Sequence, residues 1–242
     1  MTAYVNRGLT RLELKEYAPA LDDFDRAVSL GRDDAFLHAG RGMALEALRR
    51  HEEADAAFAA AFDRAGALPG PVLARLRWTF GFAIAPHLPD RAAEAFDTAL
   101  RDDPRQPQPL YGRAMLAVER GNLAEAKTFA DRAVAADPNW ADARRCRAIV
   151  CARRGEFARA EADIHWCLDR EPRAGVTLYA AACVASLAAA RLPSSAAADQ
   201  AVEFLQLAFA EGYGQDRAAT DPDLAGIRRH PRFVQLSQSP KR

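Results

Sequence analysis

The sequence predicts an all-α fold of about six consecutive helical hairpins, and three observations predict it. Small and aromatic residues recur in three aligned series with shared intervals of 34, 38, 34 and 34 residues. Prolines stand 34 residues apart near the expected helix ends, at Pro104, Pro138 and Pro172. Apolar residues keep helical spacing, and the small ones let a second helix approach closely. The three series are Ala20, Ala54, Ala92, Ala126 and Ala160; Ala27, Ala61, Ala99, Ala133 and Cys167; and Phe24, Phe58, Phe96, Ala130 and Ile164.

Residues 121–138 show how one helix of the array is encoded. Gly121 and Asn122 interrupt the preceding apolar segment, and Leu123 then opens an apolar face made mostly of alanine. Pro138 ends the helix because proline cannot continue it and biases the preceding residue away from helical geometry. Since the same order of signals recurs, each repeat is expected to be a pair of helices.

The first repeat contains Asn6, Arg7, Gly8, Tyr17, Ala20, Phe24 and Ala27. These residues and the period of about 34 resemble the tetratricopeptide-repeat (TPR) family over almost the whole chain. The resemblance implies a right-handed superhelical solenoid of stacked hairpins. It also implies a non-catalytic scaffold for protein–protein interaction that binds a peptide or protein segment in a concave groove.

The expected solenoid spans residues 1–214, and a C-terminal cap and tail follow at 215–242. The third repeat is irregular, because its four extra residues lie either in 68–71 or in 86–90 and the sequence leaves both open. Its bulky first helix either plugs the stack or exposes aromatic side chains to a ligand. The expected repeats occupy about 1–34, 35–68, 69–106, 107–140, 141–174 and 175–214.

The tail resembles a C-terminal extension of bacterial TPR proteins, some of them linked to serine/threonine kinases. Apolar tail residues are expected to cover the last open face, as terminal repeats must. No such cap precedes the first repeat. The chain is therefore expected either to be part of a longer or kinase-linked protein, or to associate through its uncapped first helix. The covering residues are Leu224, Ile227, Phe233, Val234 and Leu236.

Composition limits the function classes. Lysine plus arginine and aspartate plus glutamate both number 33, so bulk charge gives no reason to expect nucleic acid or an anionic membrane as partner. The most apolar run, residues 176–190, is too short to insert across a bilayer. We expect a cytoplasmic location, because the start lacks a signal peptide and four cysteines lie inside expected helices.

The first helix of each hairpin is expected to line the groove. Its N-terminal part is apolar and its C-terminal part basic, which suits a peptide with hydrophobic residues and a carboxylate. The alternative is that these side chains only pack or form local ion pairs. Binding of chaperone C-terminal tails is disfavoured, because Val5, Leu9 and Met43 replace the lysine and asparagines of that TPR subclass. The candidate groove residues are Val5, Leu9, Leu12, Phe36, Met43, Tyr111, Met115, Arg145, Ile149 and Arg153.

Arginines cluster in the fifth hairpin, at Arg144, Arg145, Arg147, Arg153, Arg154 and Arg159. A regulatory RNA- or phosphate-binding site is one interpretation of this cluster, and oligomerisation is another function left open for the chain. A solvated face of mixed charge is favoured, because helix spacing permits the contacts Arg159–Asp163 and Asp142–Arg145.

Catalytic and metal motifs are not found. Cys146 and Cys151 are five residues apart and point in different directions on a helix, and His51 begins no HExxH pair. Phosphate-binding loops, nucleophile elbows and kinase motifs are absent as well. We therefore expect no enzyme activity, no cofactor and no metal.

Overall fold

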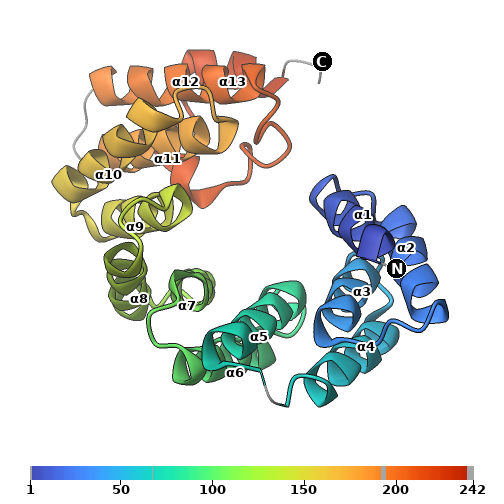
Figure 1. Cartoon of the computed structure of the whole chain (residues 1–242). Coiled ribbons are helices and arrows are strands. Elements are labelled where there is room, and N and C mark those ends of the chain that lie inside the picture. The colour runs from blue at the N-terminus through green and yellow to red at the C-terminus, as the bar shows by residue number, and fades with distance from the viewer. Residues whose placement is uncertain (1, 67, 192–194, 239–242) are drawn as a thin grey trace. The chain divides into compact units, whose positions relative to one another are not determined.

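The structure is a computed structural model that describes residues 2–66, 68–191 and 195–238. Over this part of the chain it consists of thirteen α-helices and one 3-10 helix, without a strand (Figure 1). The all-α hairpin fold predicted from the sequence is confirmed. The chain divides into two compact units, Met1–Leu116 and Ala117–Arg242, which are described separately.

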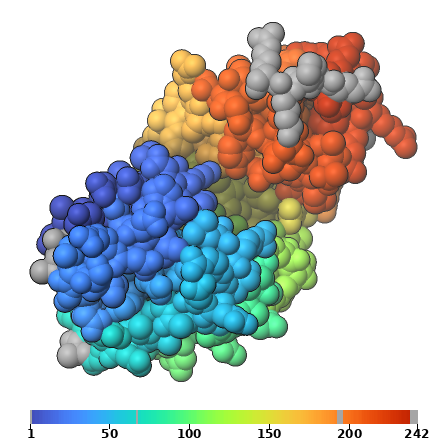
Figure 2. Space-filling view, turned by 90° about the vertical axis from the view of Figure 1, so that its right-hand side faces the viewer, coloured from blue at the N-terminus to red at the C-terminus, as the bar shows by residue number. Residues whose placement is uncertain are grey.

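The first unit contains three complete hairpins whose helices pack pairwise and against the next hairpin. Neighbouring hairpins of this unit, blue to cyan, form a continuous side-chain surface in the space-filling view (Figure 2). α7 begins in this unit and continues into the second. The helices are α1 (Thr2–Glu13), α2 (Tyr17–Ser29), α3 (Ala35–Ala47), α4 (His51–Asp63), α5 (Gly70–Ile84), α6 (Pro89–Asp102) and α7 (Pro107–Glu119).

The second unit continues the array. Here α9 packs on α8 and α10, and α11 packs on α12 and η1. The sixth hairpin was expected to carry seven extra residues at 192–198, of which 192–194 lie outside the described residues. The helices are α8 (Leu123–Ala136), α9 (Ala141–Arg154), α10 (Phe157–Arg170), α11 (Gly175–Arg191), α12 (Ser195–Ala210), η1 (Pro222–Ile227) and α13 (Pro231–Gln238).

Local sequence explains where several helices begin and end. The Asp34 carboxylate accepts hydrogen bonds from the backbone N–H groups of Phe36 and Leu37, at 3.1 and 3.0 Å, and so caps α3. Asn122 caps α8 by accepting from the Glu125 N–H at 3.2 Å. These contacts satisfy backbone donors that have no partner within the helix.

The inner packing pairs a phenylalanine with a glycine. A Cβ atom on Gly42 would lie 2.8 Å from the Phe58 ring, and one on Gly81 would lie 2.7 Å from the Phe96 ring. The 16-residue spacing of the second hairpin shortens to 15 in the third, counted from these numbers. One of the four extra residues therefore follows Gly81, and the others precede it.

Arginine–aspartate pairs join consecutive hairpins of the first unit. Arg41 of α3 donates to Asp25 of α2 at 2.6 Å, and Arg113 of α7 lies 3.1 Å from Asp97 of α6. The two pairs are offset by 72 residues, from 113 minus 41 and 97 minus 25. This offset equals the interval between Ala54 and Ala126, so the pairs occupy the same place in the repeat.

The C-terminal segment packs on α11 and α12. Leu224 and Ile227 are completely buried there, and Phe233 is nearly so. The expectation that Val234 helps to cover the apolar face is wrong, because α13 turns this side chain outward and leaves it 39% exposed. Tyr179 of α11 fixes the segment further, since its hydroxyl donates to Asp221 at 2.8 Å.

None of the helices in the described residues has both the length and the apolar character of a bilayer span.

Candidate functional site

The first unit contains a hollow of about 540 Å³ between the C-terminal halves of α3 and α5. We call it the α3–α5 hollow. Both are first helices of their hairpins, which is the side where the sequence places a binding surface. The volume lies within the range of small-ligand and peptide-anchor pockets, roughly 300–1,000 Å³. The lining residues are Met43, Glu46, Ala47, Arg49, His51, Trp78, Thr79, Phe82, Ala83, Pro86 and His87.

One wall of the hollow is apolar and firmly packed. The Phe82 ring lies 4.9 Å from the buried Phe96 ring and 6.1 Å from the Tyr111 ring. Trp78 meets Phe82 edge to face, with ring centroids 6.0 Å apart. The indole N–H of Trp78 is buried and has no acceptor among the described residues. An unpaired buried donor is costly, so this wall has a polar group left to satisfy.

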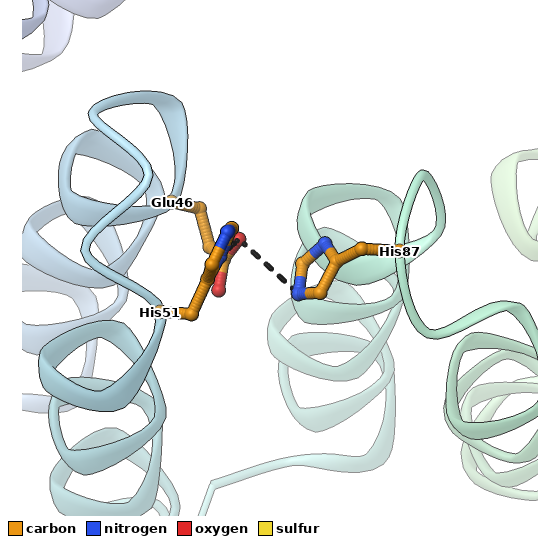
Figure 3. A group of neighbouring side chains, drawn as sticks. All are labelled: Glu46, His51 and His87. Atoms are coloured by element: carbon orange, nitrogen blue, oxygen red, sulfur yellow. Dashed lines mark hydrogen bonds and ion pairs between the residues drawn. The ribbon is translucent and has the colours of Figure 1, made fainter.

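The other end of the hollow is polar (Figure 3). His51 Nδ1 lies 2.9 Å from Glu46 Oε2, and His87 Nε2 lies 3.6 Å from the same oxygen. The two imidazole rings are 4.3 Å apart at 37°. Three groups that can hold a proton or a metal ion therefore converge at one point.

A second hollow, of about 510 Å³, lies among α4, α5 and α6. Its two arginines already have carboxylate partners: Arg77 donates to Asp102 at 2.6 Å and Arg91 to Asp55 at 3.0 Å. The α3–α5 hollow combines a rigid aromatic wall with less committed polar groups, so it is the stronger candidate site.

The structure distributes the expected groove residues of α1 and α3 over different environments. Met43 lines the hollow. Phe36 is half-buried beneath the Arg75 guanidinium, whose carbon lies 4.7 Å from the ring centroid. Leu9 is exposed, whereas Leu12 packs partly on the core around Phe24.

Val5 is corrected as a groove residue. It is only 3% exposed and packs among Ala20, Leu21 and Phe24, because α1 turns it toward α2. In α7, Tyr111 is half-buried and Met115 is exposed.

The basic end of the expected groove is internally neutralised. Arg145 is buried and donates to Asp142, to Glu171 at 2.5 Å and to the Thr177 hydroxyl at 2.8 Å. Arg153 forms a two-pronged pair with Asp223 at 2.8 and 3.0 Å. These side chains hold the second unit together and leave little free charge for a ligand carboxylate.

Ile149 lies between these arginines on α9 and is half-buried.

The remaining arginines of the fifth hairpin are paired as well. Arg144 and Arg147 converge on the buried Asp163, at 2.9 and 2.7 Å, and Arg154 donates to Glu156 at 2.7 Å. The predicted contact between Asp142 and Arg145 is present.

The predicted contact between Arg159 and Asp163 is wrong, because Arg159 reaches back to Asp131 of α8 at 2.7 Å. The arginine cluster is thus a face of mixed charge.

Sequence reasoning missed the group formed by Glu46, His51 and His87. A signal was available for two of them, since the register places apolar residues at the positions of Glu46 and His51 in the first, third, fourth and fifth repeats. His87 gave none, because it lies in the irregular third repeat.

Comparison with known proteins agrees with this architecture. Residues 83–150 match the tetratricopeptide repeat family model. No curated protein matches the sequence significantly. The solved pilF structure from Pseudomonas aeruginosa superposes with a TM-score of 0.66 at 16% identity, covering 88% of this chain and 92% of that one.

Two further solved structures are similar in fold. YrrB, a TPR protein with an unusual peptide-binding site, gives a TM-score of 0.55 at 19% identity over 78% of this chain and 97% of that chain. A chain of the APC/C hetero-tetramer Cut9–Hcn1 gives 0.71 at 12% identity over 95% of this chain and 42% of that chain. The chain therefore has the fold of tetratricopeptide-repeat proteins, and residues 83–150 carry the sequence pattern of that repeat.

Proposed function

We propose that the chain is a non-catalytic interaction scaffold that binds a peptide segment of a partner protein in the α3–α5 hollow. The observation that carries this proposal is the combination of Met43, Trp78 and Phe82 around a hollow of about 540 Å³ on the first helices. A large apolar side chain of the peptide would enter the hollow. Full burial of such a side chain contributes about 1.5–3 kcal/mol.

The chemistry of the hollow defines the peptide. Rigid aromatic walls favour an anchoring leucine, methionine or aromatic residue, because anchors in packed pockets supply most of the binding energy at interfaces. The unpaired indole N–H of Trp78 offers a hydrogen bond to a peptide carbonyl once the wall adjusts. Recognition of a peptide carboxylate by Arg145 and Arg153 is not part of the proposal, since both arginines have carboxylate partners.

The test uses peptides selected by phage display on the full chain, followed by measurement of their Kd by fluorescence polarisation. Met43→Lys places a charge in the hollow and is expected to weaken binding at least about tenfold, or 1.4 kcal/mol. Met115→Lys is the matched control, because Met115 is exposed on α7 and does not line the hollow. Equal loss in both variants, or in neither, would overturn the assignment to this hollow.

Trp78 supplies a second readout. Trp140 and Trp166 are the other two tryptophans, so a chain with both replaced by phenylalanine reports only on the hollow. A bound peptide should shift the emission of Trp78 and protect it from a soluble quencher. Binding that leaves this emission unchanged would place the peptide elsewhere.

Two broader assignments belong to the same proposal. The four cysteines are unpaired thiols, which fits the reducing cytoplasm. Nucleic acid is disfavoured as a partner, because the arginines of the fifth hairpin are paired with carboxylates; steep salt dependence of RNA binding would contradict this.

A further inference from the structure

Two positions of the second repeat break the pattern of the array. Glu46 ends α3 and His51 begins α4, eight and three residues before Ala54. The packing of the fold favours apolar residues at both positions, so the polar pair in the second repeat needs another explanation. The equivalent pairs in the first, third, fourth and fifth repeats are Leu12 and Tyr17, Ile84 and Pro89, Val118 and Leu123, and Ala152 and Phe157.

The carboxylate of Glu46 is buried, with only 6% of its side chain exposed. A buried carboxylate is costly unless a cation or strong donors face it. The groups that face it are the imidazoles of His51 and His87, and no arginine or lysine pairs with it among the described residues. Its surroundings therefore suit a bound cation.

The three side chains already approach the geometry of a metal site. One ligand atom from each residue lies within 4.8 Å of the other two. Two ligands at 2.0–2.2 Å from a tetrahedral ion are roughly 3.3–3.6 Å apart. The separation of 3.6 Å between His87 Nε2 and Glu46 Oε2 meets this value, and the separation of 2.9 Å between His51 Nδ1 and the same oxygen must widen by only a few tenths of an ångström.

We propose that Glu46, His51 and His87 bind one zinc(II) ion at the polar end of the α3–α5 hollow. Two imidazole nitrogens and one carboxylate oxygen form a ligand set that zinc accepts, with a fourth position left for water or a further donor. The hollow provides room for that fourth ligand. The ion would also tie the second hairpin to the turn that follows α5, because His87 lies in that turn.

The other group of close donor atoms in the described residues lacks these features. Asp221 accepts from Tyr179 and Asp223 from Arg153, so both carboxylates are engaged. Burial raises the pKa of the neighbouring Cys183 thiol well above its usual range. Burial likewise raises the pKa of Cys146 to about 12 and that of Cys167 to about 11, which keeps these thiols protonated and poor ligands for zinc.

The test is a titration of zinc(II) chloride into the full chain after chelator treatment and desalting, followed by isothermal calorimetry. One ion per chain is expected. His87→Ala and His51→Ala should each weaken binding by more than the tenfold that loss of a supporting contact causes, about 100-fold or more. Both side chains are partly exposed, at 27% and 41%, so both variants should fold.

His230→Ala is the matched control. His230 also faces a carboxylate, with Nε2 3.1 Å from Asp199, but no second histidine joins that pair. Zinc binding in this variant should equal that of the unmodified chain. Absence of binding by the unmodified chain, unchanged binding in His87→Ala, or equal loss in His230→Ala would each overturn the proposal.

Cobalt(II) gives an independent readout. A tetrahedral or five-coordinate cobalt site has intense visible absorption that hydrated cobalt lacks. This absorption should appear with the unmodified chain and with His230→Ala, but not with His87→Ala. Zinc should also raise the melting temperature of the first two proteins only, because a ligand stabilises the state that binds it.

Discussion

Replacing Asp163 with asparagine removes a charge on which two arginines converge. The carboxylate lies on α10 and is 2% exposed. Arg147 donates to it through Nε and Nη2, both at 2.7 Å, and Arg144 through Nη1 at 2.9 Å. The substitution leaves two guanidinium groups without their counter-charge while it hardly changes the volume of the side chain.

The size of the effect follows from burial. Breaking a buried ion pair by removing one partner costs about 3–5 kcal/mol. Arg147 and Arg144 retain 14% and 17% side-chain exposure, and asparagine still offers one acceptor, so we expect the lower end, about 3 kcal/mol. The control is Asp55→Asn, whose pair with Arg91 is 43% and 49% exposed and should contribute about 1 kcal/mol or less.

The assay is thermal unfolding of the full chain. For a chain of this size 1 kcal/mol lowers the melting temperature by about 2–4 °C, so the predicted loss is about 6–12 °C. A Trp78→Phe background leaves Trp140 and Trp166 as reporters of the second unit, which is needed because repeat arrays can unfold in parts. Equal melting temperatures for Asp163→Asn and Asp55→Asn would refute the argument from burial.

Three further predictions follow from packing and protonation. Gly42→Ala should destabilise the chain by about 1–2 kcal/mol in urea unfolding, because overpacking against a buried ring costs about 1–3 kcal/mol and the gain in helix propensity returns about 1. Leu224→Ala should cost about 2–5 kcal/mol, whereas the exposed Val234→Ala should stay within about 0.5. The hydrogen bond from Arg7 lowers the pKa of Asp23, so the stability it contributes is present above the ordinary aspartate pKa of about 3.9 and is lost as pH falls toward the folded-state value. The melting temperatures of the unmodified chain and Asp23→Asn should therefore converge below about pH 4; a constant difference would contradict this.

The regular helices were predictable because their signals are local. Leu123 opens α8 and the residue before Pro138 ends it, as the sequence indicates. Gly42 faces Phe58 because the two positions belong to adjacent helices joined by a three-residue turn, which leaves few ways to pack. Spacing within a hairpin therefore determines its contacts.

Contacts of long side chains were not predictable in the same way. Arg153 pairs with Asp223, a residue 70 positions away in the sequence. Arg159 reaches Asp131 on another helix, although Asp163 stands four residues away on its own. An arginine side chain has many rotamers of similar energy, so the positions of neighbouring helices decide its partner. Periodicity reports on the buried face of a helix and says little about these outer contacts.

The polar end of the α3–α5 hollow lies between these two cases. The register alone shows that Glu46 and His51 occupy positions that are apolar in the first, third, fourth and fifth repeats, and such a departure from local packing is expected at functional sites. The register cannot show His87, because the extra residues of the third repeat destroy the alignment there. Only the coordinates bring His87 within 3.6 Å of the Glu46 carboxylate. A buried carboxylate facing two imidazoles gives up the packing that an aliphatic side chain would supply at that position, and an ion held by all three groups would offset this loss.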